Sequence, residues 1–162
     1  MISAMEVLDA INGRLVERFP ERTCYVDVCP IDFARPSFWL QVLEDQIESG
    51  NAVLLHHSLQ LGLTLYDELD KHYDVSWQRL RQDAAAVSEL LSGPLSVKER
   101  TFTLTQKTMP READRVQIQL FLSWMDLRPG TGEEVLPPPA ETVELRYQTK
   151  KRQERKDGNG TP

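Results

Sequence analysis

The sequence has few cysteines and no long apolar run, and these two absences exclude several classes of protein. Its 162 residues include only two cysteines, Cys24 and Cys29, which is far from the composition of a small disulfide-stapled domain. Both lie in a strand-like segment, where their spacing places the two thiols on opposite faces. We therefore expect both thiols to be reduced and structural. No stretch approaches the roughly 18 to 20 uncharged apolar residues of a membrane span.

A secretory signal is not recognisable at the start of the sequence. Glu6 and Asp9 stand where a signal peptide would have a basic flank and an apolar run. We therefore expect a protein that is made and kept in the cytoplasm.

Motifs for catalysis and cofactor binding are equally scarce. The sequence has no Gly-x-Ser-x-Gly elbow and no Ser-x-x-Lys. The glycines of residues 129–134 are not followed by the Gly-Lys-Ser/Thr of a phosphate-binding loop. His56 and His57 would point to opposite faces of a strand, and His72 lies apart from them, so structural roles are favoured over metal ligation. We expect no enzyme, no catalytic residue, no cofactor and no metal.

An acidic segment could in principle bind a hard cation. It lacks the alternate-position ligands, the central glycine and the closing glutamate of a calcium loop. A solvated loop with helix-capping carboxylates is the favoured interpretation. The residues concerned are Tyr66, Asp67, Glu68, Asp70 and Asp74.

Charge is distributed unevenly along the chain. Residues 147–162 hold five basic and two acidic side chains, a net +3, which leaves −9 on residues 1–146. An acidic body argues against a domain built to bind phosphate backbones. For the basic run a solubilising tail is favoured, with contact to nucleic acid or an acidic partner as the alternative. The run consists of Lys150, Lys151, Arg152, Arg155 and Lys156.

Apolar residues recur at helical spacing in two segments, residues 5–19 and 77–91. Pro20 ends the first segment, and Ser92-Gly93-Pro94 ends the second. The stripes consist of Leu8, Ile11, Leu15 and Phe19 in the first segment, and of Trp77, Leu80, Ala84, Val87 and Leu91 in the second.

Strand patterns occupy most of the remaining sequence up to residue 127. In residues 55–66 leucines alternate with polar residues, which predicts one buried and one solvent-exposed face. Grouped strands indicate an α+β fold: a mostly antiparallel sheet of five to six strands, with two helices packed on one face. The predicted strands are residues 24–28, 37–43, 55–66, 95–97, 101–109 and 116–125, with a proline-bracketed turn at residues 30–36.

Composition changes after this domain. We expect residues 1–127 to form the α+β domain and residues 128–162 to form a Pro/Gly-rich linker and a basic C-terminal arm. Most of that arm, residues 136–162, is expected to be disordered until something binds it.

Three short motifs occur in a fixed order near the start of the sequence. They are Ala10-Ile11-Asn12 leading to Phe19-Pro20, then Tyr25-x-Asp27, then Phe33-Ala34-Arg35-Pro36-Ser37-Phe38-Trp39. This combination resembles the phage tail terminator family of bacterial prophages, and the likeness extends in outline over residues 7–127. The leucine-rich third strand is more apolar than the family pattern, and the arm extends beyond it.

The resemblance implies a structural protein that assembles in the bacterial cytoplasm into a ring, typically of six copies. The ring would sit at the head-proximal end of the virion tail, stop growth of the tube, and offer a docking surface to the neck or head. Its partners would be other copies of itself, the tail tube protein and a neck or head-completion protein. DNA would pass through the lumen without specific binding, which an acidic body suits.

The same interpretation assigns roles to segments. Leu59–Leu65 and Val116–Trp124 would carry stability, while the turn at Arg35 and Pro36, the acidic loop and the arm would bind partners. For Arg35, Phe38 and Trp39, a turn followed by a core strand is favoured over direct subunit contact.

Three alternatives stay open. One is another head-tail connector or neck protein, and a second is a cytoplasmic adaptor or nucleic-acid-associated module that uses the basic arm. A third is a small enzyme without a standard motif.

Overall fold

The structure is a computed structural model of the chain and describes residues 1–130. The predicted linker and arm therefore lie outside the described residues, except for residues 128–130. The elements in chain order are α1 (Ala4–Arg18), β1 (Thr23–Val26), β2 (Ser37–Ser49), β3 (Leu54–Tyr66), α2 (Trp77–Ser92), β4 (Leu95–Val97), β5 (Arg100–Phe102), β6 (Thr105–Thr108) and β7 (Arg115–Leu127).

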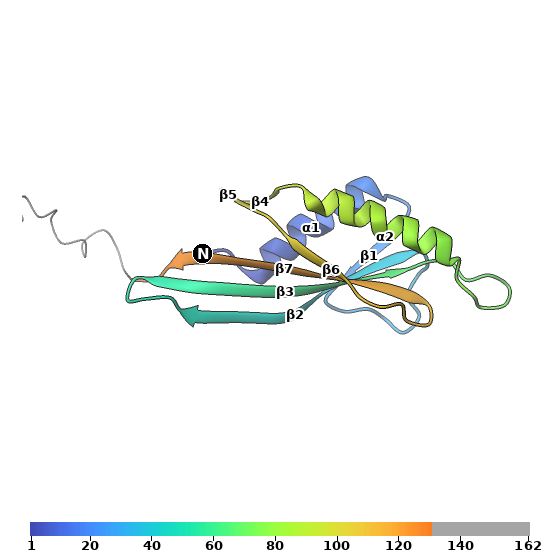
Figure 1. Cartoon of the computed structure of the whole chain (residues 1–162), viewed down its shortest axis with the longest axis horizontal. Coiled ribbons are helices and arrows are strands. Elements are labelled where there is room, and N and C mark those ends of the chain that lie inside the picture. The colour runs from blue at the N-terminus through green and yellow to red at the C-terminus, as the bar shows by residue number, and fades with distance from the viewer. Residues whose placement is uncertain (131–162) are drawn as a thin grey trace, which may run out of the picture. The chain divides into compact units, whose positions relative to one another are not determined.

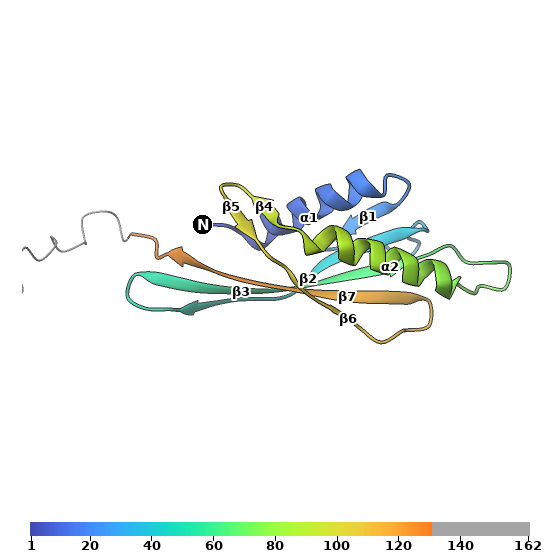
Figure 2. The ribbon, with the colours of Figure 1, turned by 45° about the horizontal axis from the view of Figure 1, so that its top comes forward.

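Five of the strands form one sheet in the order β1-β2-β3-β7-β6. The β1–β2 pair is parallel and the other three pairs are antiparallel. β4 and β5 form a separate two-stranded sheet. Both helices lie on the same side of the large sheet (Figures 1 and 2). The predicted α+β fold is confirmed.

Both helices begin at serine caps. In α1, Ser3 and Glu6 form a reciprocal capping box, in which each side chain accepts a hydrogen bond from the other residue's backbone N–H. The side chain of Ser76 accepts from the backbone N–H of Arg79 at the start of α2. These caps satisfy backbone groups that a helix start leaves without a partner.

The core lies between the helices and the facing side of the sheet. The apolar stripes predict every buried residue of the two helices except Val7, although Trp77 of the second stripe is only partly buried. These residues meet alternate residues of β3 and β7. A leucine of β3 or an apolar residue of β7 at this face is almost completely shielded from water, so this layer supplies most of the hydrophobic stabilisation. The core includes Leu8, Ile11, Leu15, Leu80, Val87, Leu91, Leu59, Leu61, Leu63, Leu65, Val116, Ile118, Leu120 and Leu122.

β2 continues to Ser49, so the predicted end near Leu43 is wrong. The distal residues are exposed and mostly polar, which leaves no alternating pattern, yet they stay paired with β3 as one arm of a hairpin. The register shifts between Val42 and Glu44, with Leu43 as the extra residue. The hairpin end reaches beyond the helices (Figure 1).

The segment predicted as one strand from residue 101 to 109 is two strands in two sheets. β5 pairs with β4 across a tight hairpin, whereas β6 pairs with β7. The buried Phe102 and Leu104 lie where the chain passes between the two sheets. A pattern that marks both pieces as extended cannot show that they pair with different partners.

The second face of the sheet, which carries no helix, is only partly exposed. Gly62, Thr64 and Tyr66 were expected to face solvent, but all three are buried. Phe33 of the β1–β2 connection packs against Tyr66, with ring centroids 4.4 Å apart. β1 also ends earlier than predicted, at Val26, because Asp27 adopts a left-handed backbone conformation with φ of 62°.

Candidate assembly surfaces

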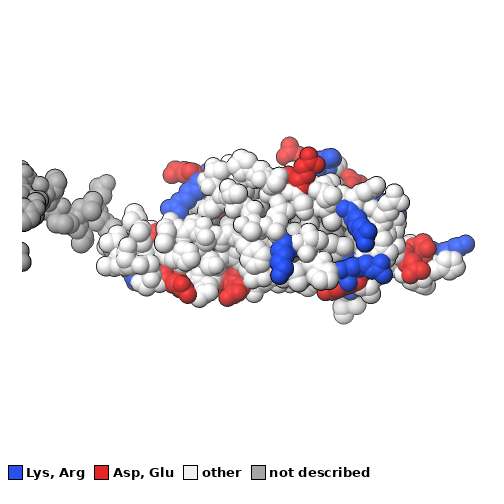
Figure 3. Space-filling model, in the orientation of Figure 1, with Lys and Arg blue, Asp and Glu red and all other residues white. Residues whose placement is uncertain are grey.

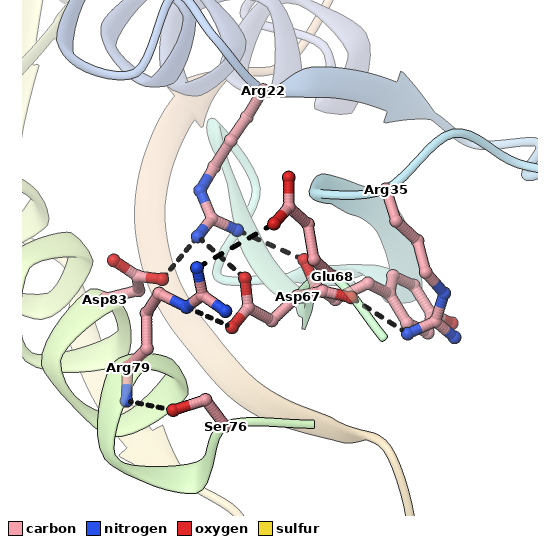
Figure 4. A network of polar contacts seen from close by, with 8 residues as sticks. Arg22, Arg35, Asp67, Glu68, Ser76, Arg79 and Asp83 are labelled. Atoms are coloured by element: carbon pink, nitrogen blue, oxygen red, sulfur yellow. Dashed lines mark hydrogen bonds and ion pairs between the residues drawn. The ribbon is translucent and has the colours of Figure 1, made fainter. Parts of the chain in front are cut away.

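A network of charged side chains joins α1, α2 and the end of β3 (Figure 4). Arg22, in the turn after α1, donates to the backbone oxygen of Tyr66 at 3.1 Å and forms an ion pair with Asp83 of α2. The Arg22 guanidinium also packs over the ring of Phe38, 5.2 Å from its centroid. Arg22 is almost fully buried, so its charge needs these partners.

Asp67 receives two arginines at the start of the acidic loop. Nε of Arg79 lies 2.9 Å from its carboxylate, and the guanidinium of Arg22 lies 3.9 Å away. Arg79 also reaches Glu68, at 3.8 Å. Asp67 is buried, so the expectation of a solvated loop is wrong for this residue. The chain folds it inward because paired arginines compensate the loss of its hydration.

Arg35, from the Arg-Pro-Ser-Phe-Trp motif, lies at the same end of the sheet. Its guanidinium donates to the backbone oxygen of Asp67 at 3.1 Å and pairs with Asp114, which precedes β7. It also lies over the rings of Phe33 and Tyr66, 4.9 and 5.2 Å from their centroids. The motif thus places a cation between three loops.

The two following aromatic residues of the motif point to opposite faces of β2. Phe38 is buried in the core, edge-on to Phe19 with centroids 5.4 Å apart. Trp39 lies on the second face and donates from Nε1 to the backbone oxygen of Asp27 at 3.2 Å. Arg35 and Phe38 therefore both have partners within this chain.

Burial and charge act in opposite directions on the carboxylates here. Burial raises the pKa of Asp83 above its usual value, because the neighbouring Arg22 only partly offsets it. Burial also opposes ionisation of Asp114, but hydrogen bonds from Arg35 and Arg115 outweigh it and hold the pKa of Asp114 below its usual value. The network is an internal brace rather than an open site.

A second buried cluster lies at the other end of β7. The carboxylate of Asp126 accepts from Nε1 of Trp124 at 3.2 Å and from the backbone N–H of Ile2 at 3.3 Å. Arg100 pairs with it at 2.7 Å. His57 stacks on Trp124 and lies 3.7 Å from the same carboxylate. One carboxylate thus ties the N-terminus and β5 to the sheet.

The three histidines are placed as the spacing predicts. His57 is buried within this cluster on the helix side, and His56 lies on the second face, paired with Met125. His72 lies in the loop before α2. Among residues 1–130, no group of three or more His, Cys, Asp or Glu side chains is placed to hold a metal ion.

The distal half of β2 forms an exposed surface that we call the acidic edge, residues 43–49. β1 pairs with β2 only at residues 37–40, so within the described chain no strand lies along the outer side of the acidic edge. Its side chains are exposed, including Ile47, which is 54% exposed. The charged members are Glu44, Asp45 and Glu48.

A hollow that we call the basic groove lies between α2 and the β6–β7 hairpin. It has a volume of about 390 Å³. Small side chains of α2 create the space, and the guanidinium of Arg111 lies 4.0 Å from the centroid of the Trp77 ring. None of its lining residues is acidic. They are Trp77, Arg81, Ala84, Ala85, Ser88, Thr108, Met109, Arg111 and Val116.

Figure 3 shows charged side chains in the regions of both surfaces. Basic side chains are spaced over α2 and the β6–β7 hairpin, and acidic side chains lie along the lower side of the hairpin end. Neither surface follows from the apolar periodicity, because each depends on charged side chains whose proximity is set by the sheet order. The acidic run Glu44-Asp45 was the available signal in the sequence.

In the described part of the chain, no helix has the length and apolarity that crossing a membrane would take. The two cysteines are both free, as expected. Cys29 lies beyond β1 in the connection to β2, so the argument from opposite strand faces does not apply to it.

Comparisons with known proteins identify no family for this chain. No protein-family model matches the sequence, and no curated protein matches it. One solved chain, whose title describes no function, has a TM-score of 0.41 and 12% identity over 79% of this chain and 97% of its own. Another, titled as the virion of a native gene transfer agent particle, has a TM-score of 0.39 and 14% identity over 72% of this chain and 88% of its own. At TM-scores below 0.5, neither likeness bears on function.

Proposed function

We propose that this chain is a non-enzymatic structural protein of a phage-like particle, which caps the head-proximal end of the tail tube as a ring. The observation that carries the proposal is the ordered set of three motifs, with Arg35-Pro36-Ser37-Phe38-Trp39 as its most specific member. That motif lies at the end of the sheet where β2 begins, β3 ends and β7 begins, and Arg35 pairs with groups from two other loops.

The fold supports assembly of copies. The sheet has a second face that carries no helix, and beyond residue 40 no strand of the described residues pairs with the outer edge of β2. An unpaired strand edge tends to bind another chain, and closure of copies into a ring removes such edges. A ring also presents one subunit to each subunit of a tube end that has the same rotational symmetry.

The second face suits a channel through which DNA slides. Its central part carries uncharged glutamines, whose amides do not attract phosphates as lysine or arginine would. The acidic edge adds Glu44 and Glu48 on the same face, which would repel the DNA backbone. A lumen lined by lysine and arginine would contradict this part of the proposal. The glutamines are Gln41, Gln60, Gln117 and Gln119.

The test is the length of tails formed without this protein. We expect cells that make the particle but lack this chain to produce tubes of uncontrolled length without attached heads, as seen by negative-stain electron microscopy. Resupplying the full chain should restore tails of uniform length. Tails of normal length would contradict the proposal.

The same images separate the alternatives. Tails of uniform length that fail to attach to heads would identify another neck or connector protein. Normal particles would favour the alternative of an adaptor or nucleic-acid-associated module. The binding of such a module to nucleic acid should weaken steeply as the salt concentration rises.

A further inference from the structure

We propose that the acidic edge of one copy binds the basic groove of the next copy, so that the large sheet continues from β6 into the β2 of its neighbour. This inference rests on the proposed ring and deepens it by naming the two surfaces that meet. Both surfaces consist entirely of described residues.

The acidic edge has what a partner strand needs. Beyond residue 40, the outer side of β2 offers backbone N–H and C=O groups to which no strand of the described residues is paired. The bulge at Leu43 does not block the segment, because pairing with β3 resumes at Glu44 and continues to Ser49. Ile47 adds an exposed apolar side chain at the middle of this segment.

The basic groove has the complementary properties. β6 is the last strand of the sheet, and among residues 1–130 no strand pairs with its outer side. Exposed Arg81 and Arg111 line the hollow, and exposed Lys107 lies on β6 beside it. Trp77 and Met109 also line the hollow and add apolar surface to it.

The strand order makes the two surfaces meet when copies repeat around a ring. β2 and β6 lie on opposite sides of the β3–β7 pair, so the acidic edge of one copy and the β6 of the next copy can become adjacent. β2 and β6 also run in opposite directions, because three antiparallel pairings separate them. The new pairing would therefore be antiparallel, like its neighbours.

On the helix side of a continued sheet, apolar and charged groups match. Asp45 and Ile47 lie on this side of β2, because they pair with Leu59 and His57 of the core face. They would face the groove beside α2, where Arg81 can pair with Asp45 and the apolar lining can cover Ile47.

On the second face, the charges also match. Glu44 and Glu48 pair with Gln60 and His56, which places them on this face. Lys107 pairs with Gln119 and so lies on the same face of β6. A shift of one residue would move every side chain to the wrong face, so the charge pattern would also fix the register.

The contact is head-to-tail, because the acidic edge and the basic groove are different surfaces. A pair of copies joined by one such contact leaves the groove of one copy and the acidic edge of the other unused, and further copies can add until the rotation closes a ring. This is the type of contact that the proposed function requires.

Charge reversal of each surface tests the inference on the full chain. Glu44→Lys with Glu48→Lys reverses the second-face charges of the acidic edge, and Lys107→Glu reverses the basic charge on β6 that they would meet. Glu17→Lys with Glu21→Lys gives the control the same charge change as the edge variant, at exposed positions away from both surfaces. Assembly is measured by sedimentation velocity over a range of concentrations.

We expect the wild type and the control to assemble, and each reversed variant alone to associate at least about tenfold more weakly. An equimolar mixture of the two reversed variants should recover assembly, since every contact between alternating copies is again between opposite charges. A ring of six permits that alternation. Recovery would also show that both variants are folded.

Three results would overturn the inference: reversed variants that assemble like the wild type, a mixture that stays dissociated, or a wild type that is monomeric at every concentration. Rings that resist both reversals would overturn this interface alone. The tail-length experiment decides the proposed function separately, since it needs no assumption about which surfaces meet.

Discussion

The guanidinium of Arg35 pairs with the carboxylate of Asp114, which lies 79 residues further along the chain. The same guanidinium donates to the backbone oxygen of Asp67. One side chain of the Arg-Pro motif therefore connects the β1–β2 connection with the loops that follow β3 and precede β7. Arginine suits this position because its planar group donates in several directions at once.

We expect Arg35→Ala to lower the free energy of unfolding by about 1–3 kcal/mol, because it leaves a partly buried carboxylate and a backbone oxygen without their donor. Asp114→Asn should cost less, because the amide oxygen still accepts a hydrogen bond. Urea denaturation measures both values. The double variant should cost less than the two single changes together, since both remove the same contact. Strictly additive values would show that the pair is not coupled.

Much of the fold follows from periodicity, and the two helices show why. Their apolar stripes alone locate α1 and α2 to within a residue or two, because each helix needs one continuous buried face. The distal half of β2 could not be predicted in this way. Residues 44–49 have no apolar alternation, and only their pairing with β3 makes them a strand.

The buried charged groups around Asp67 and Asp126 were less predictable than the fold. Asp67 belongs to an acidic run that reads as solvated, and its burial depends on Arg22 and Arg79, which lie in different elements. Asp126 likewise ends an alternating strand and gives no sign of its four neighbours. Such sites depend on long-range topology that local patterns do not encode.

Protonation of Asp126 should account for part of the fall in the free energy of unfolding in acid. Burial opposes its ionisation, but hydrogen bonds from Trp124 and the Ile2 backbone and the charge of Arg100 outweigh burial, so the pKa of Asp126 is lowered. A carboxylate whose folded-state pKa is depressed contributes stability that is fully present above its unfolded pKa, near pH 4, and is lost as pH falls through the folded value.

We therefore expect Asp126→Asn to be less stable than the wild type at pH 7, by about 1–3 kcal/mol, and to lose less further stability between pH 5 and pH 3. Thermal unfolding across this pH range measures both effects. Asp45→Asn, on the exposed acidic edge, is the matched control and should change neither. Parallel pH profiles for the wild type and Asp126→Asn would contradict the assignment.

The two thiols should react at different rates. Burial raises the pKa of Cys24 to about 11, so at pH 8 only on the order of one thiol in a thousand is ionised. Burial also raises the pKa of Cys29, but the charge of Arg115 partly opposes this effect. We expect iodoacetamide to modify Cys29 at least about tenfold faster than Cys24 in the folded protein. Each variant, Cys24→Ser or Cys29→Ser, leaves one thiol, whose rate of modification is measured by mass spectrometry. Equal rates would show that the burial of Cys24 is transient.

Neighbouring positions on β3 should respond very differently to truncation. Leu61 is completely buried against the helices, whereas Gln60 points to the second face. Leu61→Ala should lower the free energy of unfolding by about 2–5 kcal/mol, through lost transfer free energy and the cavity left behind. Gln60→Ala should cost less than about 0.5 kcal/mol. A large effect of Gln60→Ala in a monomer would mean that this chain itself also covers the second face around Gln60.

Hydrogen exchange can show whether the acidic edge is free. Every second backbone N–H along residues 43–49 points away from β3, and no strand of the described residues accepts from it. In the monomer we expect these amides to exchange orders of magnitude faster than those of β3, which is paired on both sides. Resolution of single amides by NMR separates the outward from the inward positions.

Once copies assemble through this edge, the outward amides should become protected while those of the loop at residues 67–74 remain unchanged. Protection already present in the monomer would mean that another segment of the same chain covers the edge, and fast exchange in the assembled ring would place the contact between copies elsewhere.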